Sequence, residues 1–114
     1  MKKIEAYIRE NKFEDVKNAL IKVGIPGITA YPVLGRGNQI GKGLSDSEFG
    51  AISEDILIPK KKIEIFCIEE ELDKILEVIM SRASTGKVGD GKIYISDIDE
   101  VIKIRTQERV KHKA

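Results

Sequence analysis

Along this chain, segments in which apolar residues follow the two-residue period of a β-strand alternate with segments in which they follow the period of an α-helix. Two segments, KIEAYI and KIEIFC, both begin Lys-Ile-Glu and are alternating or apolar throughout, which is typical of β-strands. After each segment, apolar residues recur on one face of a helix, and a further strand-like segment follows. The elements that this pattern predicts are strands at 3–8, 28–34, 62–67 and 91–96 and helices at 13–23 and 69–83.

Local signals mark the ends of both helices. Asn11 is a helix-capping residue type with Glu14 three positions later, and Gly24 ends the first apolar period. Residues 69–71 are all Glu, which places negative charge at the positive end of the second helix. The order βαββαβ predicts an α+β fold of the ferredoxin-like type, with two helices on one face of an antiparallel sheet.

Alternation within the strands indicates what each face of the sheet carries. The residues expected to face the helices are Ile4, Ala6, Ile8, Ile63, Ile65 and Cys67. Those expected to point away are Tyr7, Phe66, Ile68 and Tyr94, beside Glu5 and Glu64. Three aromatic side chains on one uncovered face form an apolar patch, so we expect a homo-oligomer. The alternative is that the C-terminal segment covers this face with Val101, Ile102 and Ile104.

A long segment without any sustained period separates the two halves. Residues 36–58 contain several glycines and a polar Ser-Asp-Ser-Glu stretch, and loops beyond about 12–15 residues inside a compact domain are usually functional or disordered. Fixing such a loop costs on the order of 1 kcal/mol per residue in backbone entropy. We therefore expect a mobile loop that a ligand or partner orders, within a single domain spanning 1–114 that ends in a tail at 107–114.

Composition narrows the classes of function. The net charge of +1 gives no reason to expect a nucleic-acid partner, and the chain has no apolar run long enough for membrane insertion. We expect a cytoplasmic protein. Cys67 is the one cysteine and His112 the one histidine, which excludes an internal disulfide and a Cys/His metal cluster.

The segment 86–92 (GKVGDGK) is the strongest candidate for a ligand site. Its glycine and lysine spacing is that of a Walker A motif, but Ile93 stands where Ser or Thr should hold magnesium, and the segment follows a helix instead of opening one. Glycines let backbone N–H groups approach phosphate oxygens, and Lys87 and Lys92 add charge. The alternative is an ordinary glycine-rich turn with solvated lysines.

Three cations after the last strand, Lys103, Arg105 and Arg109, are candidates to approach the same polyphosphate. No hydrolytic base with a water-orienting partner lies near the segment in sequence, so a bound nucleotide is expected to be a ligand and not a substrate.

Five segments together resemble the PII signal-transduction family over essentially the whole chain. They are KKIEA at 2–6, GRGNQ at 35–39, PKKKIEI at 59–65, TGKVGDGKI at 85–93 and VIKIRT at 101–106. The resemblance implies a non-catalytic, homotrimeric protein that senses ATP or ADP and 2-oxoglutarate. It places nucleotide in clefts between subunits, where Lys103 and Arg105 come from the neighbouring subunit.

The resemblance also implies the site residues. Those for nucleotide are Tyr7, Thr29, Gly35, Arg36, Gly37, Asn38, Glu64, Ile65, Phe66, Lys87, Val88, Gly89, Asp90, Gly91, Lys92, Lys103 and Arg105. Those for 2-oxoglutarate are Gln39, Ile40, Gly41, Lys60 and Gly89, and Gln39 also coordinates Mg²⁺ with ATP and 2-oxoglutarate. A dicarboxylate beside a triphosphate needs a cation and a lysine to offset repulsion.

The chain departs from the family pattern in the loop. The tyrosine that is uridylylated in many members has no counterpart near Ala51, and Asn38 and Lys103 stand where arginines are frequent. The resemblance implies that the loop binds a target such as an ammonium channel, nitrogenase or another enzyme of nitrogen metabolism. Two other functions stay open: a trimeric ferredoxin-like module for another metabolite or metal, and a small phosphate-handling enzyme.

Overall fold

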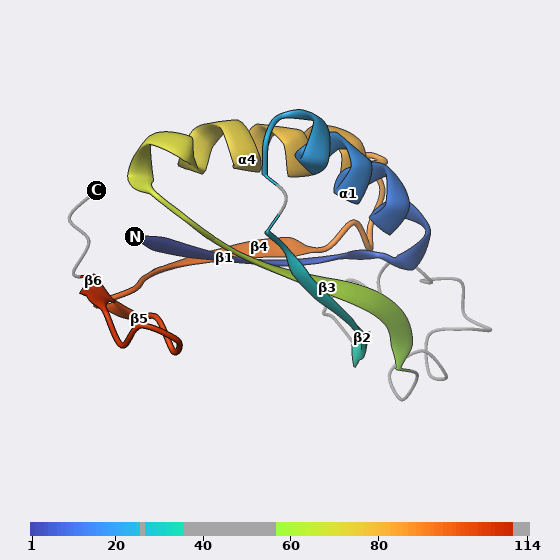
Figure 1. Ribbon diagram of the computed structural model, residues 1–114. Coiled ribbons are helices and arrows are strands. Elements are labelled where there is room, and N and C mark those ends of the chain that lie inside the picture. The colour runs from blue at the N-terminus through green and yellow to red at the C-terminus, as the bar shows by residue number, and fades with distance from the viewer. Residues whose placement is uncertain (26, 36–56, 111–114) are drawn as a thin grey trace.

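The computed structural model describes residues 1–25, 27–35 and 57–110 (Figure 1). Four of the described strands form an antiparallel sheet in the order β2-β3-β1-β4. They are β1 (Lys2–Arg9), β2 (Thr29–Gly35), β3 (Ile58–Cys67) and β4 (Lys92–Asp97). Helices α1 (Phe13–Lys22) and α4 (Glu69–Ala83) lie over one face of this sheet (Figure 1). The predicted ferredoxin-like α+β fold is confirmed, whereas residues 36–56 of the predicted mobile loop lie outside the described residues.

The core lies between the helices and the inner face of the sheet, as the alternation predicts. The strand residues buried there are Ile4, Ala6, Ile8, Ile63, Ile65 and Cys67. From the helices, Val16, Leu20, Ile75 and Ile79 close the same cluster. Burying one such aliphatic side chain contributes about 1.5–3 kcal/mol, so this cluster fixes which face of each strand points outward.

The start of β3 follows from strand pairing and not from hydrophobic alternation. β3 begins at Ile58 instead of the predicted Lys62, because its first residues pair with the end of β2, with Ile58 opposite Gly35. Pro59 is tolerated there because its other neighbour, β1, ends at Arg9 opposite Lys60. The extension brings Lys60 into the sheet beside Arg9.

The predicted cap of the first helix is wrong. Asn11 lies inside a 3₁₀ turn, η1 (Glu10–Lys12), that joins β1 directly to α1, and no side chain caps the helix at Lys12. Since the chain is already helical at Asn11, its side chain is not at a capping position. The acidic first turn predicted for the second helix is confirmed by Glu69, Glu70 and Glu71 at the start of α4.

The C-terminal segment forms a small hairpin and does not cover the outer sheet face. β5 (Val101–Ile102) pairs with β6 (Arg109–Val110) in a sheet of their own, beyond the N-terminal end of β1 (Figure 1). Ile104 is 93% exposed at its turn. The alternative in which this segment covers the aromatic patch is therefore wrong for the residues up to 110, and part of the predicted tail is a strand.

No helix in the described part of the chain is long and apolar enough to cross a membrane.

Candidate functional site

The glycine-rich turn lies between the end of α4 and the start of β4, at the end of the sheet where β1 also finishes (Figure 1). Asp90 holds this turn together. Its carboxylate accepts hydrogen bonds from the backbone N–H groups of Thr85 and Gly86, both at 2.9 Å, and from the Thr85 hydroxyl. Arg9 Nε donates to the same carboxylate at 3.2 Å. The sequence 85–90 therefore closes on itself around one carboxylate.

These contacts set the charge state of Asp90. Burial works to raise the pKa of the Asp90 carboxyl, but the hydrogen bonds from Thr85, Arg9 and Gly86 outweigh it and hold the pKa well below its usual range. The carboxylate is consequently ionised at every physiological pH. Thr85 also accepts a hydrogen bond from the Lys87 N–H at 3.2 Å, which extends the ordered part of the turn.

Two cations from the sheet hold the carbonyl groups of the turn. Arg9 Nη2 donates to the Val88 carbonyl at 2.7 Å, and the Lys60 ammonium donates to the Gly89 carbonyl. Burial, and then the positive charge of Arg9, lower the pKa of Lys60, against the opposing effect of Asp90. The turn is thus fixed from the ends of β1 and β3 as well as by its own carboxylate.

Gly91 is required by its surroundings. Its φ is +102°, and a Cβ added there would lie 1.7 Å from the Tyr7 carbonyl oxygen. Gly86 and Gly89 also have positive φ, at +79° and +99°, but a Cβ at Gly86 would meet nothing within 4 Å. The backbone of β1 therefore packs directly against Gly91, which sets the position of the turn relative to Tyr7.

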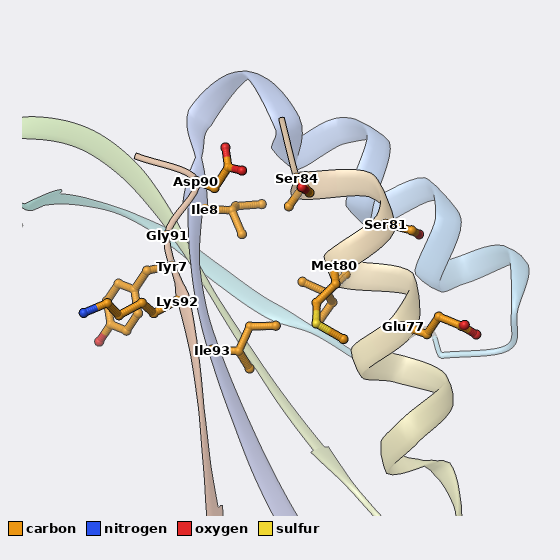
Figure 2. A pocket seen from close by; sticks show the side chains of 12 residues that line it. Tyr7, Ile8, Glu77, Met80, Ser81, Ser84, Asp90, Gly91, Lys92 and Ile93 are labelled. Atoms are coloured by element: carbon orange, nitrogen blue, oxygen red, sulfur yellow. The ribbon is translucent and has the colours of Figure 1, made fainter. Parts of the chain in front are cut away.

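A groove borders the turn. Residues of α4, the turn, β4 and β1 line it, among them Glu77, Met80, Asp90 and Ile93 (Figure 2). Tyr7 and Lys92, which are partners in the β1–β4 register, also belong to its lining. Lys87 and Lys92 are both exposed, so two cations reach solvent beside the glycine backbone. The arrangement suits a polyanion that contacts backbone amides and ammonium groups.

The outer face of the sheet carries a network of charges around Lys62. Its ammonium lies 3.0 Å from a Glu5 oxygen and 3.2 Å from a Glu64 oxygen, and Tyr31 donates to Glu64 at 2.9 Å. The hydrogen bonds from Tyr31 and Lys62 lower the pKa of Glu64. Beside this network Phe66 and Tyr94 are each 53% exposed, so the predicted aromatic patch is present.

The structure brings some predicted site residues together and separates others. Lys60, Tyr7 and the turn residues Lys87, Val88, Gly89, Asp90, Gly91 and Lys92 meet at one end of the sheet. Thr29 lies opposite Glu64 on the β2–β3 ribbon, with Ile65 buried and Phe66 exposed farther along β3, and Gly35 ends β2. Arg36, Gly37, Asn38, Gln39, Ile40 and Gly41 lie outside the described residues.

Lys103 and Arg105 do not reach the turn of their own chain. Their hairpin lies past the far end of β4, where Lys103 pairs with Glu108 at 3.5 Å (Figure 1). Arg109, the third candidate cation, makes two 2.7 Å contacts with Glu100. The expectation that closeness in sequence brings these cations to the glycine turn is therefore wrong within one chain, because a whole strand separates the two.

Sequence reasoning missed Arg9 and Thr85. Arg9 is the last residue of β1, and its part in the turn depends on the pairing that places it opposite Lys60. The sequence signal for Thr85 is its short spacing from Asp90, because an Asp side chain often accepts hydrogen bonds from residues a few positions away and so closes a local turn.

Comparison with known proteins gives consistent matches. A family model described as "Nitrogen regulatory protein P-II" matches residues 1–108. "Nitrogen regulatory protein P-II 2" of Methanothermobacter thermautotrophicus is 48% identical over 108 residues, covering 95% of this chain and 92% of that protein. "Nitrogen regulatory protein P-II" of Cyanidium caldarium is 46% identical over 107 residues, covering 94% and 93%.

The fold also matches a solved structure. The crystal structure of Arabidopsis thaliana PII bound to citrate superposes with a TM-score of 0.74 at 31% identity, covering 96% of this chain and 84% of that chain.

Proposed function

The chain belongs to the P-II family of nitrogen regulatory proteins, which are signalling proteins and not enzymes, and on this premise we propose that it senses adenine nucleotides and 2-oxoglutarate. The observation that carries the proposal is the glycine turn held by Asp90, with Lys87 and Lys92 exposed beside it. In this proposal the phosphate groups of ATP or ADP lie against residues 87–92. Glycine backbone and ammonium groups together are a common way to hold phosphate.

We propose that the nucleotide site is completed by a second copy of the chain. Lys103 and Arg105 project from a hairpin at the other end of the molecule, and Ile104 between them is 93% exposed. A contact in which this end of one copy meets the glycine turn of the next, repeated around a closed ring, gives each copy the same environment. Three copies form the ring in this proposal, with their outer sheet faces inward, which covers Phe66 and Tyr94.

The adenine side of the site is assigned to Thr29, Glu64, Phe66 and Tyr7. Thr29 and Glu64 are cross-strand partners on the outer sheet face, so they can act on one ligand together. Glu64 already accepts hydrogen bonds from Tyr31 and Lys62. Glu64 is therefore proposed to hold Tyr31 and Lys62 in place around the adenine, and Thr29 is proposed to contact the adenine directly.

The 2-oxoglutarate site is assigned to Lys60 and to residues 39–41, which lie outside the described part of the chain. Lys60 contacts the Gly89 carbonyl, which places its ammonium beside the turn proposed for phosphate. An ammonium has three donors, so Lys60 can keep this contact and also bind a carboxylate. Since Asp90 is engaged by Thr85, Gly86 and Arg9, the proposed Mg²⁺ would take oxygens from Gln39 and from the two ligands, which lets the cation offset the repulsion between them.

The output of the sensor is assigned to the loop 36–58. The proposed target is a protein of nitrogen metabolism such as an ammonium channel, nitrogenase or another enzyme, and the proposed location is the cytoplasm. Phe49 and Ala51 stand in the part of the loop where many family members have a tyrosine, so we propose that this chain is not controlled by uridylylation of a loop tyrosine.

Calorimetric titration tests the proposal. ATP and ADP should bind, 2-oxoglutarate should bind tightly only in the presence of ATP and Mg²⁺, and neither nucleotide should be hydrolysed. Lys92→Ala should weaken ATP binding more than ten-fold, about 1.4 kcal/mol, because a charge-assisted contact with phosphate is lost. Lys22→Ala, in the last turn of α1, is the matched control and should leave the affinity unchanged. Metal binding without nucleotide binding, or rapid turnover, would contradict the proposal.

A further inference from the structure

The Asp90 carboxylate has no capacity left for a ligand. Its Oδ1 accepts from the Thr85 hydroxyl and from Arg9 Nε, and its Oδ2 accepts from the N–H groups of Thr85 and Gly86. An ionised carboxylate offers about four lone-pair positions, and these four donors use them. The side chain that sequence resemblance places among the phosphate contacts is therefore directed at the turn itself and at Arg9.

Arg9 and Lys60 determine where the amides of the turn point. They hold the carbonyls of Val88 and Gly89, and they lie beside each other because they are partners in the β1–β3 register. None of the described peptide bonds is cis, and in a trans peptide the N–H points opposite to the C=O. The N–H group of Gly89 consequently points away from the Arg9 guanidinium, and that of Asp90 points away from the Lys60 ammonium. Neither N–H group has a hydrogen-bond acceptor among the described residues.

We propose that Arg9 and Asp90 are positioning residues for the nucleotide site, which present the amides of Gly89 and Asp90 to a phosphate group while the Asp90 side chain itself makes no contact with it. This inference rests on the proposed nucleotide function. Successive amides that point to one side of a turn form an anion-binding nest. Arg9 fixes the turn at two points: its Nε donates to the Asp90 carboxylate, and its Nη2 donates to the Val88 carbonyl.

The sign of one substitution separates positioning from simple electrostatics. A carboxylate close to a polyphosphate repels it, so removal of the charge in Asp90→Asn should tighten ATP binding if the turn keeps its shape. An asparagine amide, however, has one acceptor oxygen and one donor NH₂ group, so it can accept either from the two N–H groups of the turn or from Arg9 Nε, but not from both. If Asp90 is a positioning residue, the turn opens and ATP binds more weakly despite the loss of a negative charge.

The experiment compares ATP dissociation constants of the unchanged chain, Asp90→Asn and Arg9→Lys by calorimetry, with the Gly89 and Asp90 amide resonances followed by NMR. Both variants should bind ATP about ten-fold more weakly, and their two amide resonances should lose the shift that ATP causes in the unchanged chain. Arg9→Lys keeps the positive charge but cannot span two acceptors, so it gives the same answer if Asp90→Asn fails to fold. Asp15→Asn and Arg82→Lys, which alter an exposed Asp–Arg pair 3.4 Å apart between α1 and α4, are the matched controls and should bind normally.

The positioning role of Arg9 and Asp90 can fail without the proposed nucleotide function failing, and the measurements separate the two. Equal or tighter binding by Asp90→Asn, beside normal binding by the unchanged chain, overturns the positioning role alone. Unaltered amide shifts in Arg9→Lys do the same. Failure of the unchanged chain to bind ATP overturns the nucleotide function and this inference with it.

Discussion

Gly91→Ala should be among the most damaging single-atom changes in the described part of the chain. The new Cβ would lie 1.7 Å from the Tyr7 carbonyl oxygen, and the backbone φ of +102° is strained for any residue with a Cβ. The start of β4 has to move away from β1, which removes strand pairing as well as the shape of the turn. We expect the free energy of unfolding to fall by about 3 kcal/mol or more, measured by chemical denaturation, together with loss of ATP binding.

Two other glycines serve as controls for this prediction. Gly86 has a positive φ of +79° but no neighbour within 4 Å of an added Cβ, so Gly86→Ala should show the backbone strain alone, about 1–2 kcal/mol. Gly27 has neither a positive φ nor a close neighbour, and Gly27→Ala should be nearly neutral. If Gly91→Ala proves no worse than Gly86→Ala, the close contact with Tyr7 does not fix the turn.

Tyr94→Lys should convert the proposed trimer into monomers. Tyr94 is 53% exposed on the outer sheet face, and in the trimer it becomes buried against other copies. A buried lysine without a partner costs several kcal/mol, so the dissociation constant of the assembly should rise by about 100-fold or more. The single chain tolerates the change because residue 94 is exposed to solvent there. Glu5, which lies opposite residue 94 in the β1–β4 pairing, is already 3.0 Å from the Lys62 ammonium and is not free to neutralise a buried lysine. Sedimentation across a concentration series measures the result.

Ile21→Lys is the matched control for assembly. Ile21 is also 53% exposed, but it lies on α1, on the helix side of the sheet. This variant should remain trimeric. A Tyr94→Lys protein that stays trimeric at micromolar concentration would show that the outer sheet face is not the contact between copies.

The fold was predictable because burial and alternation agree along both halves of the chain. The strands that carry Ile4 and Ile63 each have three successive buried apolar residues on one face, and that face decides which side the helices cover. Hydrophobic alternation does not indicate how far two strands stay paired. The early start of β3 at Ile58 and the short hairpin of β5 and β6 depend on partner strands, which local hydrophobicity does not specify.

The sequence predicted which residues form the turn, but not which way their side chains point. Glycine and lysine spacing located the turn, whereas the direction of the Asp90 carboxylate depends on Thr85 within the turn and on Arg9 from β1, far away in sequence. The same limitation applies to Lys103 and Arg105. Their closeness in sequence to the glycine turn is no guide to distance, because β4 carries the chain to the other end of the sheet between them.

In the proposed trimer, the glycine turn of one copy and the hairpin cations of another form one nucleotide site. The most direct test is ATP titration of assemblies made by refolding equal amounts of Lys92→Ala and Arg105→Ala chains together. Each variant alone should bind ATP weakly, but about a quarter of the sites in random mixed rings should combine an intact turn with an intact hairpin and bind at the unchanged affinity. If the mixture binds no better than either variant alone, the site does not span two copies, which contradicts the proposed trimer.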